Sequence, residues 1–461
     1  MADILPFAGL RYANERVGDL AAVLCPPYDV ISEDERGTLE ARHPENVVRL
    51  ELPRGTDDAR YAAASRLLAS WTAEGILRPE GQDAFYLYEQ QFTYPGPLGG
   101  SPHPPATDSA GRSPAPSTRN GGQLYTRRGF FAAVRLEPLE RRVVLPHEKT
   151  LSAPKEDRKR LLRATHTQIS PVFGLYRDAG GSARAIIDEA VGRAPAVDTT
   201  TADGVRHRLW VLTQAPAVDR LRTLLADKQI LIADGHHRYE TMLGLAPELR
   251  PLDVAAGAAA SDYVMMFLAR AEDPGLLVLP THRMVNGLPD FSFDGLCAAA
   301  AAAFDISEGE ETTAAAIEAR LAREGADRVV FAVRAPGRPS TVWMALKPIL
   351  DLSALGPPAL RKLDVTVLHG VILGPLLAID AEAMAKQSFL TYTHDTAEAL
   401  GRVERGEVQA AFFMNPTKVE QVLAACEAGF VLPQKSTYFL PKLATGLVMY
   451  RLEGAAPRIG R

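Results

Sequence analysis

One stretch of sequence decides the fold class: Gln229-Ile-Leu-Ile-Ala-Asp-Gly-His-His-Arg-Tyr-Glu-Thr-Met242. Its apolar run, residues 230–233, predicts a buried strand. The strand ends at Asp234-Gly235, a pair that turns the chain readily because glycine tolerates a positive φ and aspartate hydrogen-bonds its own backbone. The residues after the turn have helical character. A strand, a tight turn and a helix in immediate succession indicate an α/β unit.

The predicted helix opens with His236, His237 and Arg238. Backbone N–H groups, imidazoles and a guanidinium would surround one point, an arrangement typical of phosphate binding. Asp234, at the strand end, could accept a hydroxyl proton or hold Mg²⁺. Adjacent helical positions point about 100° apart, so we expect one of the two histidines to face a ligand. That spacing also disfavours a zinc site. A polar helix start with two surface histidines is the alternative.

Residues 233–240, with the strand before them, resemble the phosphate-binding box of the ParB/sulfiredoxin-like superfamily. Sulfiredoxins carry a Gly-Cys-His-Arg-Tyr version, archaeal free serine kinases an Asp-Gly-His version, and ParB partition proteins an arginine-rich one. His236 stands where sulfiredoxins have their reactive cysteine, which excludes sulfinic acid repair. The box is more similar to the kinase type. The resemblance implies a nucleotide-gripping core over about residues 204–285.

The whole chain also resembles a bacterial family of unknown function often labelled ParB-like. The resemblance spans nearly the full length and rests on several short signatures. They are Cys25-Pro-Pro-Tyr-Asp-Val-Ile31, His43-Pro-Glu-Asn-Val-Val-Arg49, His147-Glu-Lys-Thr-Leu151, Ser170-Pro-Val-Phe-Gly-Leu-Tyr176 and Pro433-Gln-Lys-Ser-Thr-Tyr-Phe439.

Composition places the chain among globular proteins. It has 461 residues, enough for two or three domains, with 46% hydrophobic and 23% charged residues and a net charge of −5. An acidic balance argues against a protein that coats nucleic acid. The three cysteines are scattered and imply a reducing compartment without disulfides or thiolate zinc. The first residues do not resemble a signal peptide, and no run is long enough to cross a bilayer. We therefore expect a soluble, cytoplasmic protein.

The pattern of elements predicts an α/β fold with mixed (α+β) sheets: a ParB/sulfiredoxin-like core with additional α/β regions. We expect an α/β region at 1–94, a Pro/Gly/Ser-rich flexible insertion at 95–122, the core with the phosphate box at 123–290, and an α/β domain at 291–461. The segments on either side of the insertion look like adjacent strands. The insertion could therefore decorate a hairpin rather than mark a boundary.

Two further clusters follow predicted strands. His147-Glu148-Lys149 comes after a short apolar run and could supply a base, a metal ligand and a phosphate-binding lysine. His282-Arg283 follows Pro280 and could add to a phosphate pocket. For both clusters an ordinary polar turn is the alternative. The turn that contains Asp29 offers a second-choice carboxylate.

Two basic segments remain open to interpretation. The loop at 434–442 combines Lys435, Lys442 and several hydroxyls, so it could bind a phosphate, close over a site or pack one domain on another. A predicted helix that begins near Pro154 is strongly basic, and its cations form either a solvated face or part of a site.

From these patterns we interpret the chain as a kinase-like enzyme. It would move a phosphoryl group from a nucleotide (ATP or ADP) or pyrophosphate, with Mg²⁺, to a small hydroxyl compound. Free serine as the acceptor is implied only by the resemblance to serine kinases. The alternative is a ParB-like nucleotide-binding switch or partition-related protein without small-molecule turnover. We expect a nucleotide and a small molecule as partners, no nucleic acid and no membrane; a homodimer is an open option.

The candidate residues have the following expected roles. The catalytic candidates are Asp234, His237 and Glu148, with Asp234 also the metal ligand. The candidates for binding the cofactor are Gly235, His236, Arg238, His147, Lys149, His282 and Arg283.

Overall fold

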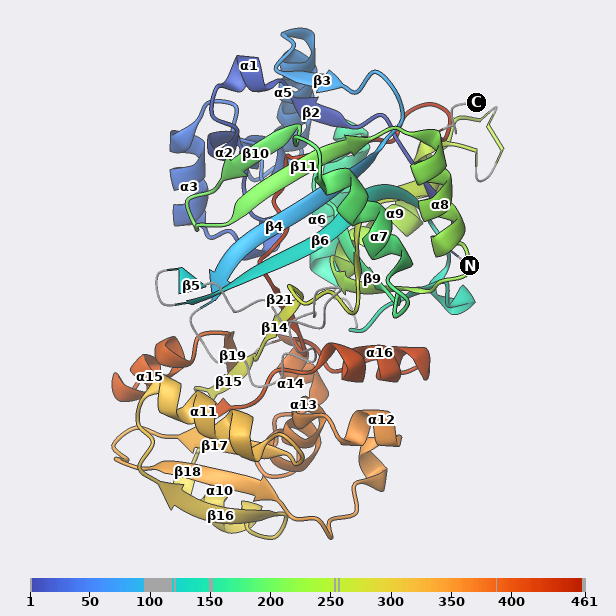
Figure 1. Ribbon diagram of the computed structural model, residues 1–461. Coiled ribbons are helices and arrows are strands. Elements are labelled where there is room, and N and C mark those ends of the chain that lie inside the picture. Colours follow the sequence, from blue (N-terminus) through green and yellow to red (C-terminus); the bar gives the residue numbers. More distant parts are fainter. Residues whose placement is uncertain are drawn as a thin grey trace.

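The computed structural model describes residues 2–94, 118–119, 122–148, 152–252, 254–255, 258–386 and 388–457. Its described part has two lobes, each built on one sheet with helices around it (Figure 1). The sheet of the first lobe is mixed, and that of the second lobe is antiparallel. The expected α/β fold with mixed sheets is confirmed. Most of the expected insertion at 95–122 lies outside the described residues.

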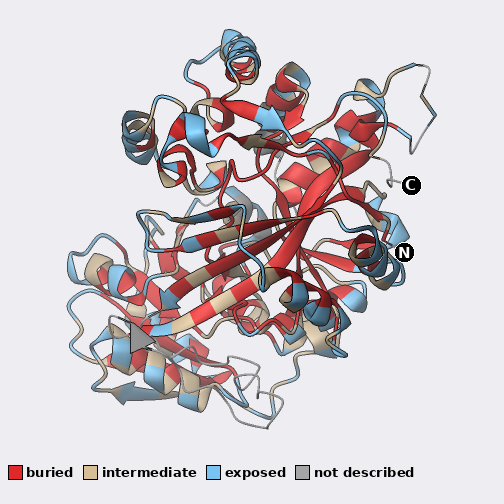
Figure 2. Cartoon of the chain, turned by 45° about the horizontal axis from the view of Figure 1, so that its top comes forward, coloured by how far each residue is buried: buried red, intermediate tan, exposed pale blue. Residues whose placement is uncertain are grey.

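The first lobe contains a ten-stranded sheet among the described residues. Eight strands follow one another across it: β10 (Val197–Thr200), β11 (Arg206–Leu212), β4 (Phe85–Tyr94), β6 (Gly122–Arg135), β13 (Tyr263–Arg270), β9 (Val172–Tyr176), β12 (Ile230–Asp234) and β7 (Val144–Leu145). The short strands β1 (Ile4–Leu5) and β5 (Thr118–Arg119) pair with β6. Every residue of β13 is buried, as expected for a central strand covered on both faces. Figure 2 shows that buried residues dominate the long strands of this sheet.

The helices of the first lobe flank this sheet. They are α1 (Asn14–Val17), α2 (Leu20–Val23), α3 (Glu33–Arg42), α4 (Val48–Glu51), α5 (Ala59–Ala73), α6 (Ser152–Thr165), α7 (Ser182–Val191), α8 (Ala215–Leu225) and α9 (His236–Leu249). Short 3₁₀ turns are η1 (Tyr28–Val30), η2 (Leu139–Arg141) and η3 (Ala260–Asp262), and β2 (Leu10–Tyr12) pairs with β3 (Leu77–Pro79).

The second lobe has a six-stranded sheet in the order β16, β18, β17, β20, β15, β19. Its strands are β15 (His282–Val285), β16 (Phe304–Gly309), β17 (Val330–Arg334), β18 (Thr341–Leu346), β19 (Leu390–Thr393) and β20 (Ala410–Phe413). Its helices are α10 (Phe293–Ala300), α11 (Ala314–Glu324), η4 (Ser353–Leu355), α12 (Pro358–Arg361), α13 (Asp364–Val367), the π-helix η5 (Leu368–Leu373), α14 (Ala381–Lys386), α15 (Thr396–Glu404) and α16 (Val419–Glu427).

The chain returns to the first lobe after α16. Strand β21 (Tyr438–Leu440) pairs with β14 (Leu277–Leu279) between the lobes, and β22 (Tyr450–Arg451) pairs with β8 (Thr167–Gln168). Isolated bridges join Thr445 to Cys25 and Met449 to Leu10. The returning segment therefore belongs to the first lobe although it follows the second in sequence (Figure 1).

The sheets cross the boundaries expected from the sequence. Strands β4 and β6, on either side of the expected insertion, are antiparallel neighbours, with Tyr94 opposite Gln123. Strand β15, inside the expected core 123–290, pairs with β19 and β20 of the second lobe. The first lobe thus joins the expected regions 1–94 and 123–290, as a decorated hairpin would. No helix of the described chain combines the length and apolarity that a membrane span requires.

Candidate functional site

The phosphate-type box has the predicted local structure. Strand β12 ends at Asp234, and α9 begins at His236 without a side-chain cap. Gly235, between them, has φ 91°, a left-handed conformation that disfavours other residues. A Cβ at this position would lie 2.9 Å from Arg238 Nε. Glycine is therefore required both by the backbone and by the close approach of the arginine.

Asp234 lies between two cations. Its Oδ2 accepts a hydrogen bond from Lys442 Nζ at 2.9 Å, and its Oδ1 is 3.6 Å from Arg238 Nη2. Burial acts to raise the pKa of Asp234, but Lys442 and Arg238 outweigh it and hold the pKa below its usual range. Asp234 also raises the pKa of Lys442, against the effect of burial. The carboxylate and the ammonium are both charged at neutral pH.

Lys442 comes from the returning C-terminal segment, which buried side chains of the first lobe hold in place. The fully buried Arg127 donates to the carbonyl of Pro441 at 2.6 Å and also to Gln90. The Gln90 side-chain amide donates to the Lys442 carbonyl at 2.9 Å. Two neighbouring residues of β4 and β6 thus fix the backbone on which Lys442 is mounted.

His236 forms part of a buried chain of polar contacts. Its Nε2 accepts the backbone N–H of His147 at 3.1 Å, and the two rings meet edge to face at 4.5 Å. His147 Nδ1 donates to the Ile232 carbonyl at 2.6 Å, and its Nε2 lies 2.7 Å from Thr437 Oγ1. Burial, with His147 beside it, lowers the pKa of His236 to about 3, so this ring is neutral. It fixes the 147–148 turn against the helix start.

Glu148 joins the same turn to the C-terminal loop. Its Oε2 accepts the backbone N–H of Lys435 at 2.7 Å, and its Oε1 lies 3.2 Å from His147 Nε2. Burial acts to raise the pKa of Glu148, but His147 and the other donors lower it to about 2. The predicted phosphate-binding Lys149 lies outside the described residues.

These groups open onto a cleft of about 750 Å³ between the lobes. The first lobe contributes the box, and the second lobe contributes the end of β19 and α15. Among the residues that line the cleft are Tyr28, Asp29, Glu148, Asp234, Gly235, His236, His237, Arg238, Tyr392, His394, Arg402, Lys435, Thr437, Tyr438 and Lys442. Both His236 and His237 are among its lining residues, and which of the two faces a ligand stays a prediction.

His237 and Arg238 differ in environment. His237 is half-buried, and burial together with Lys155 lowers its pKa, so its imidazole is neutral at pH 7. The guanidinium of Arg238 is buried and donates to the carbonyl of Pro171 as well as facing Asp234. Its charge raises the electrostatic potential beneath the helix start without being exposed to solvent.

His282 and Arg283 do not line the cleft. Both are buried in β15, which is paired on each side. His282 contacts Thr396 Oγ1 at 2.9 Å, whereas Arg283 donates to the carbonyl of Lys435 at 2.9 Å. The structure therefore places Arg283 under the 434–442 loop as a support and places His282 inside the second lobe.

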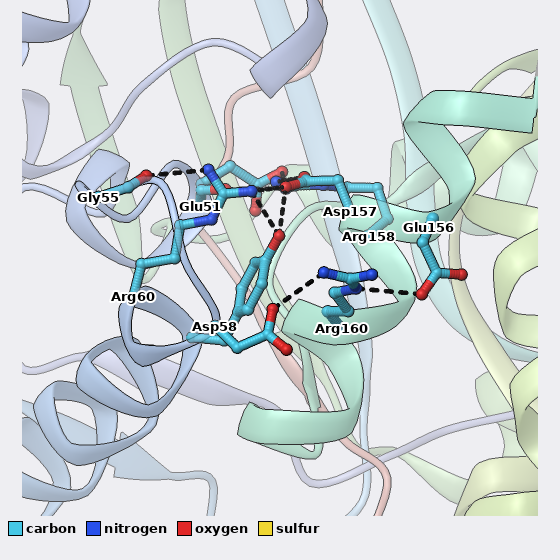
Figure 3. A network of polar contacts seen from close by, with 9 residues as sticks. Glu51, Gly55, Asp58, Arg60, Glu156, Asp157, Arg158 and Arg160 are labelled. Carbon is cyan, nitrogen blue, oxygen red and sulfur yellow. Dashed lines mark hydrogen bonds and ion pairs between the residues drawn. The ribbon is translucent and has the colours of Figure 1, made fainter.

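A polar network on the first lobe supports the Tyr28 turn at the mouth of the cleft. Arg158 lies over the Tyr28 ring at 4.3 Å and donates to the Glu51 carbonyl at 2.8 Å. Asp157 of the same helix pairs with Arg60 of α5 at 2.7 Å (Figure 3). The basic face of α6 is thus paired with carboxylates; its further partners are Glu240, Glu248, Asp58 and Glu156.

Several cleft residues were not among the predicted site residues. The sequence predicts Lys442 and Tyr438 only as members of the loop at 434–442. The high proportion of polar residues in this loop is the pattern that indicates a site. Tyr438 stacks on His394 with ring centroids 3.5 Å apart, and Lys442 Nζ lies 4.1 Å from the Tyr438 centroid on the same ring. Tyr392, His394 and Arg402 carry no local signal, because only the packing of the second lobe brings them to the cleft.

The comparisons with known proteins identify the family. The family model described as "Protein of unknown function (DUF1015)" matches residues 4–100 and 117–366, and the chain belongs to this family. The resemblance to a family of unknown function is thereby confirmed, whereas its ParB-like label receives no support. No curated protein matches the sequence.

Solved structures show only distant likeness. A conserved hypothetical protein from Pyrococcus furiosus is 15% identical, with a TM-score of 0.34, covering 69% of this chain and 94% of its own. A free serine kinase in complex with AMP is 13% identical, with a TM-score of 0.36 and coverages of 70% and 90%. SbnI from Staphylococcus aureus is 10% identical, with a TM-score of 0.35 and coverages of 69% and 87%.

Proposed function

We propose that the cleft binds the phosphates of a nucleotide or of pyrophosphate, and that the protein is a kinase-like phosphotransferase acting on a small hydroxyl compound. One observation carries the proposal: Asp234 ends a buried strand directly before an uncapped helix start and pairs with Lys442 and Arg238 on the wall of the cleft. Phosphoryl transfer needs positioned cations and helix N–H groups more than covalent chemistry.

The phosphates would lie against the first turn of α9. The leading N–H groups of a helix have no intrahelical acceptors, and the helix dipole favours anions there. Lys442 and the exposed Lys435 supply positive charge to the same cleft from the C-terminal loop. Lys442 is held by Asp234 in a fixed position, so it is ready to meet a phosphate without a large loss of side-chain freedom.

His237 is the proposed proton acceptor. In the transfer, the bond between the phosphorus and the donor oxygen breaks, a bond to the acceptor hydroxyl oxygen forms, and the hydroxyl proton passes to the imidazole. A neutral imidazole at pH 7 suits this role. Asp234 and Glu148 have lowered pKa values and already accept hydrogen bonds, so they suit charge placement better than proton removal.

The described residues fit Mg²⁺ only as a companion of the phosphates. They contain no group of three or more His, Cys, Asp or Glu side chains arranged for a metal. Asp234 would hold the ion together with phosphate oxygens, the usual arrangement for nucleotide-bound Mg²⁺. When bound, the ion would neutralise phosphate charge. The acceptor would enter from the second-lobe wall, and free serine is one candidate for it.

The test is phosphorus NMR of the purified protein with Mg²⁺, ATP, ADP and pyrophosphate, and pooled hydroxyl compounds that include serine. We expect a new phosphomonoester signal. Lys442→Met should reduce its rate by about 10²- to 10³-fold, because one positioned charge partner of the transferring group is lost. Lys386→Met is the matched control: it removes a lysine from the exposed surface of α14 and should leave the rate unchanged.

The other outcomes are informative. Nucleotide binding that Lys442→Met weakens, with no ester formed from any compound of the pool, would replace the enzyme proposal by the nucleotide-binding switch. Equal binding by wild type and Lys442→Met would mean that the cleft is not the phosphate site.

A further inference from the structure

A second, smaller cavity lies on the first lobe between α7, the middle of β6 and the end of β13. Its volume is about 160 Å³, several times what one water molecule needs, and it shares no lining residue with the cleft. Three arginines line it: Arg128 from β6, Arg184 from α7 and Arg270 from β13. Asp188 and Asp273 are the carboxylates in its wall.

Arg270 is the unusual member of this group. It is the last residue of β13 and only 7% exposed. Within the described part of the chain, its guanidinium has neither an ion pair nor a side-chain hydrogen bond, although it reaches the cavity. None of its nitrogens is among the fully buried atoms of the described chain that lack a hydrogen-bond partner, so they open onto the cavity, where water or a ligand can accept their hydrogen bonds.

Neither carboxylate of the wall serves as that partner. Asp188 is shared by Arg128, at 2.8 Å, and Arg184, at 3.3 Å. Asp273 accepts the backbone N–H groups of Gly275, at 2.9 Å, and Arg128, at 3.4 Å. Burial raises the pKa of Asp273 to about 6 and the nearby Arg270 acts to lower it, but no hydrogen bond or ion pair joins the two side chains in the described part of the chain. A partner for Arg270 can therefore come from solution.

We propose that this cavity binds the phosphate group of a small ligand, either inorganic phosphate or a phosphorylated metabolite. Arg270 holds the group at the buried end of the cavity, and the more exposed Arg128 and Arg184 flank the mouth. The planar fork of arginine matches the oxygens of a phosphate. The site is independent of the function proposed for the cleft, since it uses other residues and would stand if the cleft had no enzymatic role.

The experiment titrates inorganic phosphate into the Lys442→Met protein by calorimetry, so that the cleft contributes little. We expect one remaining binding event. Adding Arg270→Met should weaken it at least tenfold, since a charge-assisted contact is lost. Adding Arg193→Met, an exposed arginine just beyond the end of α7, is the matched control and should leave it unchanged. Equal affinity in the Arg270→Met protein would overturn the proposal.

Melting temperatures separate a binding role from a structural one. Phosphate should raise the melting temperature of the wild type, because a ligand stabilises the state that binds it, and should not raise that of Arg270→Met. Without phosphate, Arg270→Met should melt no lower than the wild type, since it removes an unpaired buried charge. A decrease that is equal with and without phosphate would show a structural role and overturn the proposal.

A conservative variant and a second ligand test how the phosphate is recognised. Arg270→Lys keeps the charge but loses the fork, so it should fold and bind phosphate with an intermediate affinity; binding as tight as the wild type would contradict recognition by the guanidinium. Glycerol phosphate, compared with inorganic phosphate, identifies the source of the ligand. Tighter binding of the ester indicates a metabolite, and exclusion of the ester indicates the free ion.

Discussion

Two clusters of nearly the same composition have different positions in this molecule. His236, His237 and Arg238 follow β12, whereas Thr281, His282 and Arg283 precede or begin β15. The first group starts a helix and lines the cleft. The second is buried inside a sheet with hydrogen-bonded neighbours on both sides. The same residue types therefore line a cleft or support a loop, depending on whether the chain turns away from the sheet at that point.

The two arginines show this difference most clearly. Arg238 donates to the carbonyl of Pro171 but also faces Asp234 beneath the helix start, where a ligand would add negative charge. Arg283 donates hydrogen bonds to main-chain carbonyls, among them those of Thr281 and Lys435. A carbonyl that accepts from a buried guanidinium offers no room for a phosphate. Phosphate binding depends on which N–H donors are left for the ligand, and composition alone does not give this.

The largest expected effect separates these two arginines. Arg238→Met should weaken nucleotide binding by about 1.5–3 kcal/mol, or roughly 10- to 150-fold in Kd, because a charge near the phosphates is lost. Arg283→Met should instead lower the free energy of unfolding by about 1–3 kcal/mol, since buried carbonyls lose their donor. Calorimetric titration and urea unfolding measure the two quantities. If Arg283→Met weakened binding as much as Arg238→Met while keeping its stability, the comparison would fail.

A pair of glycines tests the turn chemistry next to each cluster. Gly235 and Gly287 both have positive φ, but a Cβ meets Arg238 only at Gly235 and open space at Gly287. Gly287→Ala should cost about 1 kcal/mol, the backbone strain alone. Gly235→Ala should cost about 2–3 kcal/mol, since the arginine must also move. Urea unfolding of both variants measures the difference, and equal costs would mean that Arg238 is free to shift.

The smallest effect concerns pH. Burial lowers the pKa of both His236 and His282 to about 3, below the usual 6.5 of the unfolded chain. Below pH 6.5 the unfolded state binds more protons, so each histidine makes stability fall as the pH drops from about 6.5 towards 3. His236→Gln and His282→Gln should each flatten this slope by up to about 1.4 kcal/mol per pH unit.

Unfolding free energies measured between pH 7 and 4.5 test this prediction. His166, whose side chain is 40% exposed, is the control, because His166→Gln removes a histidine that is not buried. An unchanged slope in either buried variant would show that its ring is already protonated in the folded state.

Local patterns predicted the part of the site that is local. The strand, the glycine turn and the helix start at 230–242 follow from the apolar run and the Asp-Gly pair. Long-range partners could not be predicted in this way. The neighbours of β15 come from β19 and β20, more than one hundred residues later, so the burial of His282 has no signal near residue 282. The same is true of Lys442, which is 208 residues from Asp234.

Asp234 and Arg127 both bind residues of the returning C-terminal segment, so the cleft can form only after that segment has been synthesised. Arg127 and its acceptor Pro441 are 314 residues apart. At a translation rate of about 5–20 residues per second, Arg127 exists for roughly 15 to 60 s before that carbonyl is made. During this interval Arg127 lacks the Pro441 carbonyl. Asp234, once it is made, lacks Lys442 until the same segment is synthesised. Assembly of the cleft is therefore one of the last steps of folding during synthesis. A chain that stops before Lys442 lacks the ion pair with Asp234.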